Sequence, residues 1–162
     1  MEYEKEITNM INGTCLINEL MSKHTTYGIG GPVSFYIKPK DKEEIINILL
    51  FAKTKKIPIY FIGSGSNLLV SDSGIKGIVL SLEKSLKKIT FLSETMIYAE
   101  GGSMLGKLVK LSVSNNLTGL ESLIGVPGTL GGALVMNCLL YTFSEPTRRY
   151  AISYAVFCLK KK

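Results

Sequence analysis

The chain has 162 residues, 46% of them hydrophobic, which suits a folded unit of one or two lobes and excludes a disordered polar chain. No apolar run approaches the roughly 20 residues needed to span a bilayer, and the acidic first residues lack the apolar core of a secretory signal, so we expect a cytoplasmic protein without a membrane partner. The net charge of +6 is concentrated at the end, because residues 138–162 carry five basic side chains and one acidic side chain, so we also expect no nucleic-acid partner.

The first half of the chain predicts helices and strands in alternation. Asp41 is placed to cap a helix, and Glu44 follows it by three residues, as in a capping box. A strand–helix–strand unit is expected here, and it would put the first glycine-rich turn at the carboxyl end of a strand, where ligands commonly bind. In order, we expect a helix over residues 2–12, a strand over 33–37, a helix over 42–55 and a strand over 57–62.

After Asp72 the pattern changes to short strands separated by turn-forming residues. Gly101 and Gly102 interrupt the third of these strands, and Ser103 is predicted to cap the helix that follows. In order, we expect strands over residues 77–82, 88–92 and 96–100, a helix over 104–114 and a strand over 150–159.

Residues 62–72 form the first of two glycine-dense segments, and we call them the first glycine loop. Glycine permits positive φ and close approach of a ligand, and consecutive backbone N–H groups in such a turn can hold an anion. The loop lacks the lysine of a P-loop and the third glycine of a dinucleotide fingerprint, so taken alone it is also compatible with a plain connection. The predicted cofactor-binding residues here are Gly63, Ser64, Gly65, Ser66, Asn67 and Leu68.

Residues 119–133 form the second glycine-dense segment, which we call the second glycine loop. Its glycines would each cost about 1 kcal/mol in an ordinary helix, a cost that is accepted where a backbone or a ligand packs closely. Together the two loops predict a phosphate-bearing cofactor. The predicted cofactor-binding residues in the second loop are Gly125, Val126, Pro127, Gly128, Gly131, Gly132 and Ala133.

No catalytic or metal-binding residue is predicted. His24 is the single histidine, and its polar neighbours predict a surface position. The three cysteines are odd in number and form no Cys-x-x-Cys pair, which argues against a disulfide framework or a zinc site. Glu83, Glu94 and Glu100 have no paired spacing that would indicate acid–base catalysis.

Three segments, in order, resemble those of the UDP-N-acetylenolpyruvoylglucosamine reductases, the MurB family. Residues 23–32 (KHTTYGIGGP), which we call the entry segment, resemble the family's entry motif; the first glycine loop resembles its pyrophosphate loop; and residues 119–137 resemble its second flavin motif. The resemblance implies an α+β, PCMH-type FAD-binding fold of two α/β subdomains, a small βαβ lobe followed by a mixed-sheet lobe. We expect an N-terminal arm over residues 1–24, a first lobe over 25–76, an incomplete second lobe over 77–162, and no substrate domain.

The resemblance implies FAD as the cofactor and NADPH as the co-substrate, with a hydride passing to the enolpyruvyl group of a UDP-sugar. The first glycine loop would hold the FAD pyrophosphate through backbone N–H groups, and the second would pack beside the flavin. The family's catalytic arginine, serine and glutamate have no matching positions, so we expect the chain to be inactive alone and to meet the UDP-sugar only if a substrate domain is supplied. The alternative is a non-catalytic flavin- or nucleotide-binding module.

The sequence departs from the family at two places. Gly28 stands where the family has arginine or lysine, and Cys138 begins a segment in which the family's glycines are absent. We therefore expect residues 138–149 to be poorly ordered or awkwardly packed, with residues 150–159 still able to pair as a strand.

Overall fold

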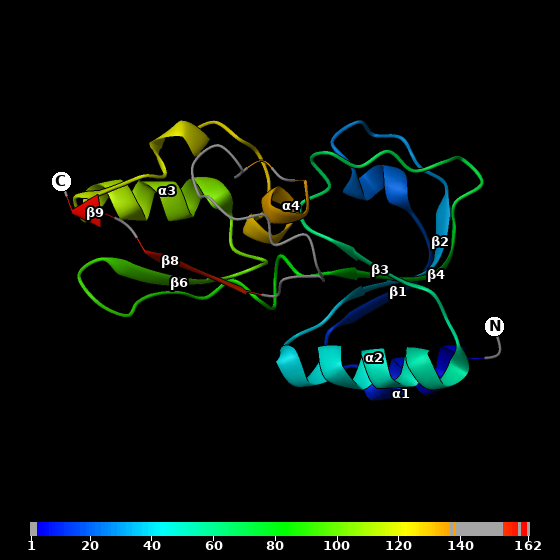
Figure 1. Cartoon of the computed structure of the whole chain (residues 1–162). Coiled ribbons are helices and arrows are strands. Elements are labelled where there is room, and N and C mark those ends of the chain that lie inside the picture. Colours follow the sequence, from blue (N-terminus) through cyan, green and yellow to red (C-terminus); the bar gives the residue numbers. More distant parts are fainter. Residues whose placement is uncertain (1–2, 137, 139–153, 159, 162) are drawn as a thin grey trace. The chain divides into compact units, whose positions relative to one another are not determined.

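The computed structural model describes residues 3–136, 138, 154–158 and 160–161, and it divides into two compact units, Met1–Ser85 and Leu86–Lys162. Each unit combines a β-sheet with helices, so the expected α+β class and the two-lobe organisation are present (Figure 1). The division lies after Ser85 rather than after residue 76, because strand β4 (Ile75–Ser81) is hydrogen-bonded between two strands of the first sheet.

The first unit contains a four-stranded sheet in the order β1–β2–β4–β3. Strands β2 and β3 both pair with β4 in parallel, so the predicted strand–helix–strand unit exists with a third strand inserted between its two strands. Strand β1, which lies in the region expected to be an N-terminal arm, pairs antiparallel with β2 at the sheet edge. The remaining bounds are β1 (Thr14–Leu20), β2 (Pro32–Lys38) and β3 (Ile59–Ile62).

Two helices cover one face of this sheet, and a 3-10 turn with the first glycine loop covers the other. Successive side chains of a strand point to opposite faces, so β2 supplies Phe35 and Ile37 to one core cluster and Tyr36 to the other. The pairing of β2 with β4 shifts register between Val33 and Phe35, and Val33 joins the cluster of Tyr36. Figure 1 shows helix α1 (Glu4–Met10) beside helix α2 (Lys42–Lys55), and the 3-10 turn is η1 (Met21–His24). The loop side is completed by Met21, Val70 and Val79.

The predicted cap of α2 is present, but the predicted capping box is not. The Asp41 side chain accepts a hydrogen bond of 3.0 Å from the Glu44 N–H, as an N-cap should. In a capping box the Glu44 carboxylate would accept a hydrogen bond from the Asp41 N–H, and it does not do so here. It is buried and accepts backbone N–H groups of Asn12 at 2.7 Å, Gly13 at 3.2 Å and Lys40 at 2.8 Å. Glu44 therefore fastens the segment between α1 and β1 to the start of α2.

The described part of the second unit has a three-stranded antiparallel sheet in the order β5–β6–β8 and two short α-helices. Ser103 does not cap helix α3: the N-cap position is Met104, and the Ser103 hydroxyl instead donates to the Lys88 carbonyl at 3.4 Å. The element bounds are β5 (Ile89–Phe91), β6 (Met96–Glu100), α3 (Leu105–Ser114), β7 (Leu117–Thr118), η2 (Glu121–Leu123), α4 (Leu130–Val135), β8 (Tyr154–Cys158) and β9 (Lys160–Lys161), the last of which pairs with β7.

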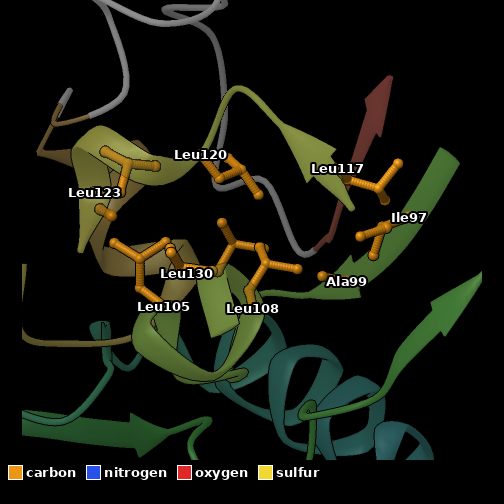
Figure 2. Close-up of a cluster of buried hydrophobic side chains, with 10 residues drawn as sticks. Ile97, Ala99, Leu105, Leu108, Leu117, Leu120, Leu123 and Leu130 are labelled. Atoms are coloured by element: carbon orange, nitrogen blue, oxygen red, sulfur yellow. The ribbon is translucent and has the colours of Figure 1, made fainter. Parts of the chain in front are cut away.

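A leucine-rich cluster forms the core of the second unit and anchors the second glycine loop at three points. Figure 2 shows side chains from β6 and α3 meeting Leu120, Leu123 and Leu130, which are almost completely buried. Burying a leucine side chain contributes about 1.5–3 kcal/mol. The loop residues between these anchors are thereby held against a fixed core.

The strand expected over residues 150–159 is found as β8, which pairs with β6 from Tyr154 opposite Glu100 to Cys158 opposite Met96. Most of the segment expected to be disrupted, residues 139–149, lies outside the described residues. Among the described residues, no helix has both the length and the apolar character needed to cross a membrane.

Candidate functional site

The structure brings two of the three motif segments together within the first unit. The Thr26 N–H donates to the Gly65 carbonyl at 3.1 Å, and the Gly31 N–H donates to the Ser71 carbonyl at 3.0 Å. The entry segment is thus hydrogen-bonded to the first glycine loop near both ends of that loop. The sequence treats the two segments as separate motifs; the structure makes them one backbone-paired unit.

Close backbone approach explains several glycines of this unit. Gly65 has a φ of +71°, and a Cβ placed there would overlap the carbonyl oxygen of His24. A Cβ at Gly31 would likewise overlap the Asp72 carbonyl oxygen, and one at Gly74 would overlap that of Pro32. The glycine at position 65 is therefore required by the entry segment, whether or not a ligand also approaches it.

A polar cavity opens where three parallel strands end. It has a volume of about 290 Å³ and is bordered by Lys38 at the end of β2, by Gly63 and Ser64 directly after β3, and by Glu83 just beyond β4. The carboxyl ends of parallel strands are the usual ligand position in open α/β sheets. The remaining lining residues are Lys23, His24, Thr25, Thr26 and Tyr36.

His24 is packed, not exposed as its polar neighbours predicted. Its ring stacks on Tyr36 with centroids 3.8 Å apart and an interplanar angle of 14°, and its Nε2 lies 3.1 Å from Glu19 Oε1. Its side chain is only 14% exposed. The sequence contained no signal for this position, because the ring is covered by β1 and β2 residues that only the folded sheet brings near.

Two ionisable groups around His24 have shifted pKa values. Burial raises the pKa of the Tyr36 hydroxyl, with the negative charges of Glu83 and Glu19 acting in the same direction. Burial also acts to raise the pKa of Glu19, but hydrogen bonds from His24 and Lys23 outweigh it and hold that pKa below its usual range. Tyr36 is therefore a neutral hydroxyl at physiological pH, and Glu19 is a carboxylate.

A second hollow, of about 320 Å³, lies along the same two segments and is largely apolar. Tyr27 and Ile29 of the entry segment and Asn67 and Leu69 of the first glycine loop form it. Tyr27 and Leu69 are 59% and 72% exposed, so the hollow presents apolar surface to solvent. The predicted site residues of the first loop therefore border two different surfaces, Gly63 and Ser64 the polar one and Asn67 the apolar one.

The second glycine loop is built into the second unit by backbone pairing with residues that follow β6. The Leu105 N–H donates to the Gly128 carbonyl at 3.0 Å, the Leu130 N–H to the Ser103 carbonyl at 2.8 Å, and the Gly131 N–H to the Gly101 carbonyl at 2.7 Å. Thr129 caps α4, since its hydroxyl accepts from the Gly132 N–H at 3.4 Å.

Other predicted residues of this loop face open space. A Cβ at Gly125, which has a φ of +90°, would meet nothing within 4 Å, and one at Gly132 would come no closer than 3.4 Å to the Thr129 hydroxyl. Gly125, Pro127 and Gly132 are exposed, whereas Gly128 and Ala133 are buried. Among the described residues of its own unit, the loop thus leaves room beside Gly125 and Gly132.

The described residues offer no evident metal site or acid–base pair. No group of three His, Cys, Asp or Glu side chains within them could hold a metal ion. Glu100 accepts a hydrogen bond from the Lys88 N–H at 2.8 Å, and Cys138 is exposed. The described side chains instead form a polar cavity and an apolar hollow, whose linings suit a ligand with charged and apolar parts.

Comparison with known proteins agrees with this description. The family model for the FAD binding domain matches residues 33–148. The UDP-N-acetylenolpyruvoylglucosamine reductase of Desulforamulus reducens is 45% identical over 132 residues, covering 82% of this chain and 43% of the relative; that of Clostridium tetani is 38% identical over 143 residues, covering 86% and 46%. The chain therefore spans less than half the length of these relatives.

Solved structures share the fold. The crystal structure of UDP-N-acetylenolpyruvylglucosamine reductase from Thermus caldophilus superposes with a TM-score of 0.62 at 24% identity, covering 91% of this chain and 53% of that one. A Physcomitrella patens BBE-like 1 variant superposes with a TM-score of 0.60 at 17% identity, covering 81% and 30%. The chain belongs to the FAD binding domain family, with FAD as the cofactor, and within that family it is homologous to the UDP-N-acetylenolpyruvoylglucosamine reductases, as its three motif segments predicted.

Proposed function

We propose that this chain is the part of a UDP-N-acetylenolpyruvoylglucosamine reductase that binds and orients FAD, serving the NADPH-dependent reduction of an enolpyruvyl UDP-sugar for peptidoglycan synthesis in the cytoplasm. The observation that carries the proposal is the pairing of the entry segment with the first glycine loop beside the polar cavity. That cavity lies at the carboxyl ends of three parallel strands, and its lining combines lysines with the start of a glycine loop.

The first glycine loop is assigned to the pyrophosphate. Backbone N–H groups of residues 63–68 would donate to phosphate oxygens, and the short side chains of Ser64, Ser66 and Asn67 lie in the same stretch. Gly65 has its own backbone contact with His24, so its part is to hold the loop's shape. The apolar hollow at Tyr27 and Leu69 would suit an aromatic ring of the same cofactor.

The second glycine loop is assigned to the flavin. Residues 125–128 and 131–133 would pack beside the ring. Among the described residues, no atom lies within 4 Å of a Cβ placed at Gly125, and the Thr129 hydroxyl, at 3.4 Å, is the nearest to one at Gly132. When bound, FAD supplies the hydride acceptor and donor of the reaction. The chain's own contribution is positioning and the exclusion of water, because anchoring by Leu120, Leu123 and Leu130 keeps the loop backbone fixed.

FAD binding is testable on the whole 162-residue chain by visible absorbance of the purified protein and by thermal unfolding with added FAD. A ligand that binds only the folded state stabilises it by about 2.7 kcal/mol at 100 times its Kd. The variant Ser64→Asp puts a negative charge at the cavity rim and should raise the Kd for FAD about tenfold or more, roughly 1.4 kcal/mol. Ser73→Asp, an exposed serine outside the cavity lining, is the matched control.

A melting temperature unmoved by excess FAD would contradict the proposal, and equal Kd values for the two aspartate variants would contradict the phosphate assignment.

We further propose that the 162-residue chain does not itself consume NADPH in response to the UDP-sugar, because no residue matches the family's proton donor and a bound flavin without one lacks transition-state stabilisation. NADPH oxidation that depends on added UDP-sugar, measured against a reaction without the sugar, would overturn that expectation.

A further inference from the structure

The polar cavity contains a lysine, Lys38, that forms no ion pair with any carboxylate of the described residues. Lys38 ends strand β2 on the same face as Tyr36, and its Nζ lies 5.4 Å from the centre of the Tyr36 ring. None of the ion pairs found among the described residues includes Lys38, whereas Lys23 of the same cavity lies 3.3 Å from Glu19. The cation–π contact with Tyr36 holds the Lys38 ammonium over the cavity while leaving its N–H donors free for a ligand.

A carboxylate lines the same cavity from just beyond the end of the neighbouring strand, β4. Glu83 follows β4 and is half-buried, and its charge reaches the Tyr36 hydroxyl. A carboxylate is a poor neighbour for a bare phosphate, because like charges repel, but it is a good acceptor for hydroxyl groups. A cavity with one free ammonium and one carboxylate therefore matches a ligand in which a phosphate is joined to a polyol.

We propose that this cavity binds a phosphate–polyol unit of the dinucleotide, with Lys38 donating to a phosphate oxygen and Glu83 accepting from sugar hydroxyls. The inference rests on the proposed function, since it adds two side chains to a phosphate site otherwise made of backbone N–H groups. FAD contains two such units, a ribose phosphate and a ribityl phosphate, and both have the chemistry that the cavity recognises. Separate titrations with ADP and with FMN identify which unit occupies it.

The test measures Kd values for FAD by flavin fluorescence, and for ADP and FMN by thermal shift, on the full chain. Lys38→Gln should raise the Kd for FAD about tenfold at low ionic strength, and the difference from wild type should shrink with added salt, because screening weakens a charge–charge contact. Lys40→Gln is the matched control, since Lys40 is exposed, lies two residues away and does not line the cavity. Lys38→Arg should restore most of the affinity.

Glu83→Gln should raise the Kd about threefold to tenfold for whichever of ADP or FMN the cavity takes, and Glu43→Gln, an exposed carboxylate on α2, should leave it unchanged. If wild type binds FAD but Lys38→Gln behaves as Lys40→Gln does at low salt, the cavity assignment is wrong while the proposed function stands. If wild type binds none of FAD, ADP and FMN, both are wrong. A Lys38→Gln effect that salt does not diminish would also overturn the assignment, since it would be structural.

Discussion

The two glycine loops differ in what surrounds their glycines. Backbone atoms of the chain fill the space beside Gly65 in the first loop, whereas the space beside Gly125 and Gly132 in the second loop is open among the described residues. A Cβ at Gly65 would overlap the His24 carbonyl oxygen, while one at Gly125 would meet nothing within 4 Å and one at Gly132 nothing closer than 3.4 Å. The first loop therefore needs glycine in order to fold. In the second loop, folding does not explain Gly132, and the room beside it is available to a ligand.

The comparison also concerns charge. Around the first loop, Lys23, His24, Lys38 and Glu83 surround a polar cavity. The second loop is surrounded by apolar side chains, with Ile124 at 68% and Val135 at 73% exposed. Under the proposed function, the charged part of FAD would meet the first unit, because the polar cavity lies there.

The largest effect is expected from Gly65→Ala. The new Cβ would both overlap the His24 carbonyl and force alanine into a φ of +71°, so we expect a loss of unfolding free energy of about 2–5 kcal/mol from strain and displacement together. Urea unfolding without cofactor measures it. Gly28→Ala has a similar φ of +66° with nothing within 4 Å, so it should lose only about 1–2 kcal/mol. Equal losses in the two variants would mean that overlap with His24 does not matter.

The next effect is on cofactor affinity. Gly132→Ala places a methyl group on the exposed side of α4, where it should stabilise the cofactor-free chain by up to about 1 kcal/mol yet raise the Kd for FAD about tenfold, because the space is then occupied. Gly106→Ala in α3, whose new Cβ would meet nothing within 4 Å among the described residues, should give the same sign of stabilisation without loss of FAD. Paired thermal unfolding and flavin titration check both; unchanged FAD affinity in Gly132→Ala would remove the ligand explanation.

A smaller effect is expected from Thr129→Ala, which removes the cap of α4 at the heart of the second loop. The hydrogen bond from the Gly132 N–H is long, 3.4 Å, so the loss should lie near the low end of the usual 0.5–2 kcal/mol for a missing N-cap, about 0.5–1 kcal/mol. Thr129→Ser keeps the hydroxyl and should lose less. Denaturant unfolding of the three proteins measures this, and a Ser variant as unstable as the Ala variant would indicate that the methyl group matters instead.

The smallest effect is a pH dependence of the unfolding free energy that arises from Glu19 in the first unit. The pKa of Glu19 is lowered in the folded chain, so its contribution to stability is present above the ordinary carboxyl pKa and is lost as the pH falls through the lowered value. Its partner Lys23 is 61% exposed, so solvent screens the ion pair and we expect about 0.5 kcal/mol or less. Comparing wild type with Glu19→Gln from pH 7 to pH 3 should show the two stabilities converging in acid; a constant difference would contradict the ion-pair explanation.

Local sequence patterns predicted most of the elements. Strand β6 has the expected bounds of Met96–Glu100, and helix α2 begins after its Asp41 cap as expected, because periodicity and capping are properties of neighbouring residues. The two glycine loops and the entry segment were also recognisable, because glycine and its spacing are visible without a fold. Strand β1 was missed because it is an edge strand whose burial alternates only weakly.

By itself, then, the sequence determined the α+β class, the glycine loops, the family and its cofactor. Only the tertiary structure decided that β4 lies between β2 and β3, that the first unit extends to Ser85, and that the His24 ring stacks on the Tyr36 ring. The alternation of apolar and polar residues along a strand indicates which of its faces is buried, but it does not indicate which strand lies beside it. Pairing and close approach between distant segments depend on where the whole chain places them, so they are absent from any local stretch of sequence.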